Sequence, residues 1–69
     1  MLSKEEFITN VVNDIRKNRG NNTDEYEIRK FIKENDGWLM QFYNKCINDT
    51  PIHQDYWIST FAANVELMI

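Results

Sequence analysis

The sequence predicts a small all-α fold, a single-domain bundle of three to four short helices over residues 1–69. Three observations predict this class. Apolar residues recur at helical spacing along most of the chain, capping and stop signals divide that pattern into short segments, and 69 residues suffice for one domain only. Because 42% of the residues are hydrophobic and 13% are aromatic, a folded core is expected instead of disorder.

The first helix is expected over residues 4–19. Ser3 and Glu6 have the spacing of a capping box, in which each residue satisfies a backbone amide of the other. Cations fill the last turn, where they complement the helix dipole, and Gly20 provides the stop. The apolar face that identifies this helix consists of Phe7, Ile8, Val11, Val12 and Ile15.

Two shorter helices are expected next, over residues 24–35 and 38–48. The first follows a loop at residues 20–22 and is capped by Asn22 or Thr23. Residues 35–37, Asn-Asp-Gly, indicate a stop or a sharp turn between the two helices. The second has a wide apolar arc and is expected to lie deep in the bundle; the arc comprises Trp38, Leu39, Met40, Phe42, Tyr43, Cys46 and Ile47.

The last helix is expected over residues 51–68, with Thr50 as N-cap and Pro51 at the first helical position. It has apolar residues on two faces. One stripe consists of Trp57, Phe61, Val65 and Met68, broadened by Ile58, Ala62 and Ile69, and of these Trp57 and Phe61 are expected in the core. A second stripe, on the opposite side, consists of Ile52, Tyr56, Ala63 and Leu67. A helix of this kind is either central in a bundle or shared with another chain.

Enzymatic chemistry is not expected. A nucleophilic site could be built only from Cys46 and His53, with Asp49 or Asp55 orienting the histidine. However, Cys46 falls on an apolar helix face, where a free cysteine is usually a small buried hydrophobe. One cysteine and one histidine cannot form a zinc site, and no phosphate-binding loop or calcium loop is present. We therefore expect no catalytic residue, no metal and no cofactor.

A basic face on the second helix offers an alternative function, nucleic-acid binding. Tyr26, Arg29, Lys30 and Lys33 share the side opposite the apolar residues, and cations with an interleaved aromatic suit phosphates and stacked bases. The chain has a net charge of −3, however, and affinity for nucleic acid depends mainly on neutralising phosphates. A solvated helix face is the favoured interpretation.

The net negative charge is concentrated in one part of the chain. All 8 Lys and Arg residues lie within residues 1–45, where they balance the acids, whereas residues 46–69 contain three acids and no Lys or Arg. The same segment carries the second apolar stripe. Aromatic anchors bordered by charge are typical of a protein interface, so a partner-binding surface is expected at Asp49, Ile52, Asp55, Tyr56, Ala63, Glu66 and Leu67.

These observations favour a small acidic, non-enzymatic protein-interaction module that binds through its last helix. A stoichiometric inhibitor or regulator is the expected role, with a basic, nucleic-acid-handling protein as a candidate partner. A homodimer subunit is the other interpretation. The Asn, Ile and Lys bias fits a phage or mobile-element origin. The lone Cys46, and a start without the apolar stretch of a signal peptide, suggest a reducing, cytoplasmic compartment.

Overall fold

The computed structural model of the protein describes residues 1–20 and 22–69. These residues form four helices and no strand: α1 (Lys4–Arg19), α2 (Glu25–Glu34), α3 (Asp36–Ile47) and α4 (Pro51–Met68). The predicted all-α class is therefore confirmed, and the four helices agree with the predicted number of three to four. The predicted loop at residues 20–22 includes Asn21, which lies outside the described residues. Within the described residues, no helix is long and apolar enough to cross a membrane.

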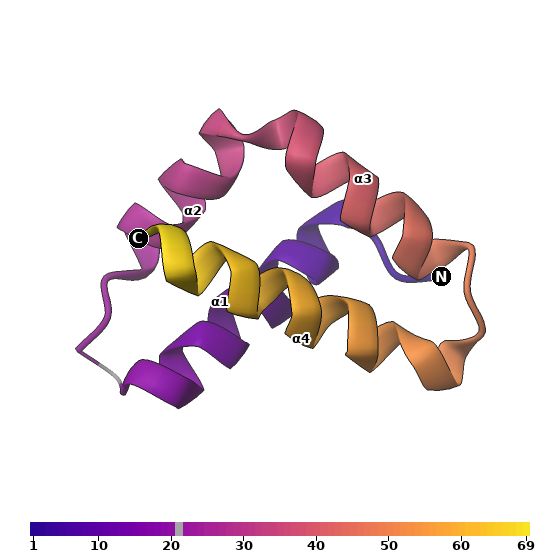
Figure 1. Cartoon of the computed structure of the whole chain (residues 1–69), viewed down its shortest axis with the longest axis horizontal. Coiled ribbons are helices and arrows are strands. Elements are labelled where there is room, and N and C mark those ends of the chain that lie inside the picture. Colours follow the sequence, from indigo (N-terminus) through magenta and orange to yellow (C-terminus); the bar gives the residue numbers. More distant parts are fainter. Residues whose placement is uncertain (21) are drawn as a thin grey trace.

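The helix α4 is central to the bundle (Figure 1). It packs against both α1 and α3, and α2 packs against the same two helices. The beginning of the chain is held beside α3, because the Tyr43 hydroxyl donates a hydrogen bond to the Leu2 carbonyl at 2.8 Å. The other end lies near α2, where Ile69 lines a hollow together with Phe31. Both ends of the chain are thus anchored on the bundle.

The bounds of α1 follow from local signals. The Ser3 hydroxyl accepts a hydrogen bond from the Glu6 amide at 3.0 Å, and the Glu6 carboxylate accepts one from the Ser3 amide at 2.9 Å. At the other end, Gly20 has a φ of +95°, a conformation that residues with a Cβ avoid. Its amide donates to the Arg16 carbonyl at 2.7 Å, which completes the last turn.

The start of α2 differs from the prediction. Its N-cap is Asp24, whose carboxylate accepts a hydrogen bond from the Tyr26 amide at 2.9 Å, and not Asn22 or Thr23. All three residue types favour the N-cap position. Asp24 takes this position because its carboxylate lies within hydrogen-bond distance of an amide in the first turn of α2.

The stop predicted at residues 35–37 is wrong for two of its three residues. Only Asn35 separates α2 from α3, and Asp36 and Gly37 lie in the first turn of α3. The Asn35 side-chain amide donates to the Phe31 carbonyl at 2.8 Å and satisfies the end of α2. A positive φ is not required of Gly37, and a glycine in a first helical turn costs little enough for packing to override it.

An aromatic cluster fills the centre of the bundle. Phe61 of α4 lies at its middle, with ring centroids 5.1 Å from both Trp38 and Phe42 and 5.9 Å from Phe7. The fully buried side chains around these rings come from all four helices: Phe7, Val11, Val12, Ile15, Ile28, Ile32, Leu39, Cys46, Phe61, Ala62 and Val65. The core is continuous, so the helices bury their apolar faces against one another.

One of the two apolar stripes on α4 faces this core. Ile58, Phe61, Ala62 and Val65 are buried, and Trp57 is half-buried. Met68 belongs to the same stripe in the sequence but is 65% exposed. Ile69, which broadens that stripe in the sequence, is exposed as well.

Candidate protein-docking surface

The side of α4 turned away from the core carries an exposed row of side chains, which we call the outer face. It consists of Ile52, Tyr56, Ala63 and Leu67, all of which are exposed. The exposed fractions are 83% for Ile52, 62% for Tyr56 and 84% for Leu67. Steps of four and seven residues place the four side chains on one side of a helix. Large apolar side chains thus form a row that nothing in the described chain covers.

A hydrogen-bonded cluster closes the loop before α4, and Asp49 is its centre. The Trp57 indole donates to Asp49 Oδ2 at 2.8 Å, and the Thr50 amide donates to Oδ1 at 2.8 Å. The ring of His53 lies 3.0 Å from the same Oδ1 atom. These donors, the Trp57 indole first, lower the pKa of Asp49 to about 2. The carboxylate therefore has a structural role: it fastens the loop to the first two turns of α4.

Stability is expected to fall in acid as Asp49 becomes protonated. Because folding lowers its pKa from 3.8 to about 2, Asp49 stabilises the folded state above pH 3.8, and this contribution is lost as the pH falls toward 2. Urea unfolding followed by circular dichroism between these pH values measures the loss. The Asp49→Asn variant is expected to have a flatter pH dependence than the wild type.

The matched control for that measurement is Asp55→Asn. Asp55 lies on α4 and outside the Asp49 cluster, so its removal is expected to leave the acid-induced loss of stability as steep as in the wild type. If Asp49→Asn and the wild type lose stability with equal steepness, the assigned role of Asp49 is wrong.

The second acidic residue of the expected surface, Glu66, is tied to α1. Arg19 Nε lies 3.6 Å from Glu66 Oε2, and Arg19 Nη2 donates to the Glu66 carbonyl at 2.7 Å. A further contact of 3.4 Å joins Arg19 to the carbonyl of Ile69. The guanidinium therefore covers the end of α4, where unpaired carbonyls and the helix dipole favour a cation. Sequence reasoning missed Arg19, because no local pattern links residues 47 positions apart.

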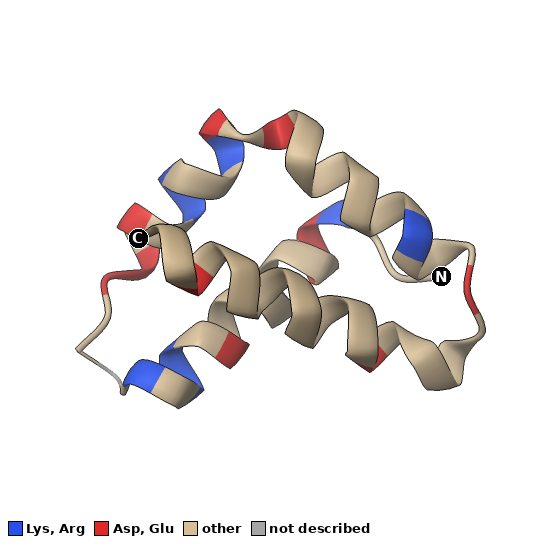
Figure 2. Ribbon diagram, viewed as in Figure 1, with Lys and Arg blue, Asp and Glu red and all other residues tan. Residues whose placement is uncertain are grey.

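Asp55 is the remaining acid of the three. Among the described residues it has no hydrogen bond or ion pair, and it borders a shallow hollow between α4 and α1 together with Asp14, Lys17 and Ser59. The three acidic residues expected to border the outer face are therefore not equivalent, because other groups of the protein bind the Asp49 and Glu66 carboxylates. Figure 2 shows that α4 itself bears acidic residues and no cation.

The basic face expected on α2 is divided by the fold. Tyr26, Lys30 and Lys33 are exposed, but the Arg29 guanidinium turns toward α1. It lies 2.7 Å from Glu5 and 2.9 Å from Glu25, and these carboxylates, Glu25 first, raise its pKa. An arginine held by two carboxylates is poorly placed to bind phosphate. The four residues proposed for nucleic-acid binding thus do not form one continuous cationic surface.

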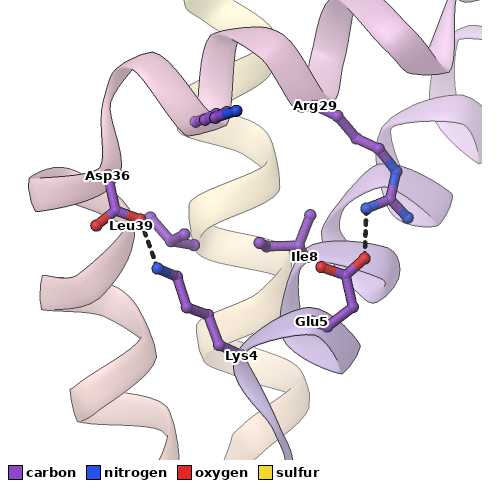
Figure 3. A pocket seen from close by; sticks show the side chains of 7 residues that line it. Lys4, Glu5, Ile8, Arg29, Asp36 and Leu39 are labelled. Carbon is purple, nitrogen blue, oxygen red and sulfur yellow. Dashed lines mark hydrogen bonds and ion pairs between the residues drawn. The ribbon is translucent and has the colours of Figure 1, made fainter.

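Arg29 and Lys33 line a hollow between α1, α2 and α3 (Figure 3). Its volume is about 460 Å³, with Ile8 and Leu39 as apolar lining. Two ion pairs cross its rim: Lys4 to Asp36 at 2.7 Å, and Arg29 to Glu5 at 2.7 Å. Both pairs join α1 to another helix at the surface of the bundle, where an exposed ion pair contributes at most about 1 kcal/mol to stability.

The structure gives Cys46 and His53 separate surroundings. Cys46 is fully buried, and its thiol contacts the Gln54 carbonyl at 3.7 Å. Burial, followed by the charges of Asp49 and Asp55, raises the pKa of the thiol, which disfavours the reactive thiolate. His53 is exposed and contacts Asp49 and Thr50. Among the described residues, no group of three or more acidic, histidine or cysteine side chains could hold a metal ion.

The fold defines the protein as a small four-helix domain whose central helix exposes an apolar outer face. Comparisons with known protein families, with curated proteins and with solved structures gave no match.

Proposed function

We propose that this protein is a non-enzymatic interaction module that docks a protein partner on the outer face of α4. One observation carries the proposal: Ile52, Tyr56 and Leu67 expose most of their side chains in a single row along the helix. Isolated apolar residues on a surface need no explanation, but several large apolar side chains exposed on one side of a helix are typical of an interaction site.

The chemistry of the row also supports protein docking. Tyr56 combines a large apolar ring with a hydroxyl group, a combination that is enriched at interface centres. Its ring packs edge-on against Trp57, with centroids 5.3 Å apart, so the side chain is partly ordered before any partner binds. A preordered anchor loses less conformational entropy on binding than a free one.

Site-specific photocrosslinking tests the proposal. A photoreactive amino acid in place of Tyr56 is expected to form a covalent adduct with a protein when cells that express the chain are irradiated. The same amino acid in place of Gln41, an exposed residue of α3, serves as the control and is expected to form none. Absence of an adduct at position 56, or equal adducts at both positions, would contradict the proposal.

A further inference from the structure

We infer that the partner which fits the outer face is a second copy of this chain, packed with its α4 antiparallel across a two-fold axis. This inference rests on the proposed docking function of that face and specifies its occupant. Three features of α4 carry it: the spacing of the row, the sizes of its side chains and the charges beside it.

The spacing of the row is symmetric. Ile52, Tyr56, Ala63 and Leu67 are separated by four, seven and four residues, so the midpoint lies between Ser59 and Thr60. A two-fold axis at that midpoint brings every member of the row level with another member of the row in the second copy. Symmetric dimers require a self-complementary patch of this kind.

The side chains that meet in this arrangement complement one another in size. Tyr56 lies level with Ala63 of the second copy, so the largest side chain of the row faces the smallest. Ile52 lies level with Leu67 of the second copy, which pairs the two most exposed aliphatic side chains. A parallel arrangement would instead place Tyr56 on Tyr56 and leave a gap between the two alanines.

The charges beside the row are compatible with the antiparallel arrangement. Measured along the helix axis, Asp55 lies within the rise of two residues from Glu66 of the second copy. The carboxylate and the carbonyl of Glu66 already hold Arg19 of the same copy. The Arg19 guanidinium therefore offers Asp55 a cation across the interface. The two copies of Asp55 are about 14 Å apart along the helix axis, beyond the screening length of about 10 Å at 0.1 M salt.

Such an interface is small. The row from Ile52 to Leu67 extends over about 22 Å of helix, and one helix pair of this length falls near the lower end of specific interfaces, about 1,200 Å² in total. We therefore expect a reversible dimer with a Kd in the micromolar range.

Sedimentation velocity from about 1 µM to about 500 µM tests the association itself. The wild-type mass is expected to rise from 8.3 kDa toward twice that value. Ala63→Glu, which fills the space that receives Tyr56, is expected to raise the Kd at least about tenfold. The control Gln41→Glu adds the same charge on α3 and is expected to dimerise like the wild type. A wild type that stays monomeric throughout overturns the inference.

Cysteine crosslinking tests the orientation. Ser59 lies next to the axis, so Ser59→Cys is expected to form an intermolecular disulfide, which requires Cα atoms within about 7 Å. Ile52→Cys is expected to form none, because its two copies are about 22 Å apart along the axis. Buried Cys46 makes the wild type the background control. Crosslinking of Ile52→Cys in place of Ser59→Cys overturns the antiparallel arrangement.

The photocrosslink at position 56 separates this inference from the proposed function. An adduct with twice the mass of the chain supports both the docking function of the outer face and the second copy as its partner. An adduct with a different protein, together with a monomeric wild type, overturns the second copy as partner and retains the docking function of the outer face. Absence of any adduct overturns both.

Discussion

Replacing Phe61 with alanine is expected to lower the free energy of unfolding by about 3–5 kcal/mol. Phe61 is fully buried, and its ring lies at the centre of the aromatic cluster. Truncating a buried phenylalanine costs about 3–5 kcal/mol of the free energy of unfolding, through lost burial and the cavity left behind. A domain of 69 residues has a total free energy of unfolding of about 3–10 kcal/mol. The loss therefore amounts to about a third or more of the total free energy of unfolding.

Urea unfolding monitored by far-ultraviolet circular dichroism measures this loss. The matched control is Tyr56→Ala, since Tyr56 is an aromatic residue of the same helix with 62% of its side chain exposed. That variant is expected to remain within about 0.5 kcal/mol of the wild type. Similar losses in both variants would show that Phe61 does not organise the core as described.

The neighbouring alanines of α4 are expected to respond oppositely to glutamate. Ala62 is fully buried, so Ala62→Glu forces a long side chain and a charge into the core, at a cost of at least about 3 kcal/mol. Ala63 is exposed on the outer face, so Ala63→Glu is expected to fold with nearly unchanged stability. The two variants have the same composition and the same net charge, so only burial distinguishes them.

Thermal unfolding at pH 7, at a protein concentration well below the Kd of any dimer, measures this difference. Ala62→Glu is expected to unfold at a much lower temperature than the wild type, and Ala63→Glu is expected to show a cooperative transition close to that of the wild type. Equal destabilisation of both variants would place the boundary between core and outer face elsewhere on α4.

Most of the secondary structure could be predicted, because its signals are local. The capping box at Ser3 and Glu6, the glycine at position 20 and the proline at position 51 act within one helical turn. They set the bounds of α1 and the start of α4. Local signals failed at Asp36 and Gly37, where the choice between a turn and a helix start was decided by packing against the rest of the bundle.

The candidate site could be predicted only in part. Two apolar stripes were evident on the last helix, but the sequence did not establish which side chains the other helices cover. It also could not foresee that Arg19 covers the end of α4, or that Arg29 turns from the basic face toward Glu5. These contacts join residues 47 and 24 positions apart.

By itself, the sequence determined an all-α chain, the ends of its first and last helices and the two apolar sides of α4. Only the tertiary structure decided that Phe61 and Ala62 are covered while Ile52, Tyr56 and Leu67 remain exposed. The physical reason is the distance along the chain over which each interaction acts. Capping and helical periodicity act over one or two turns, whereas burial depends on which helices the chain brings together, and α4 is buried where α1 and α3 pack against it.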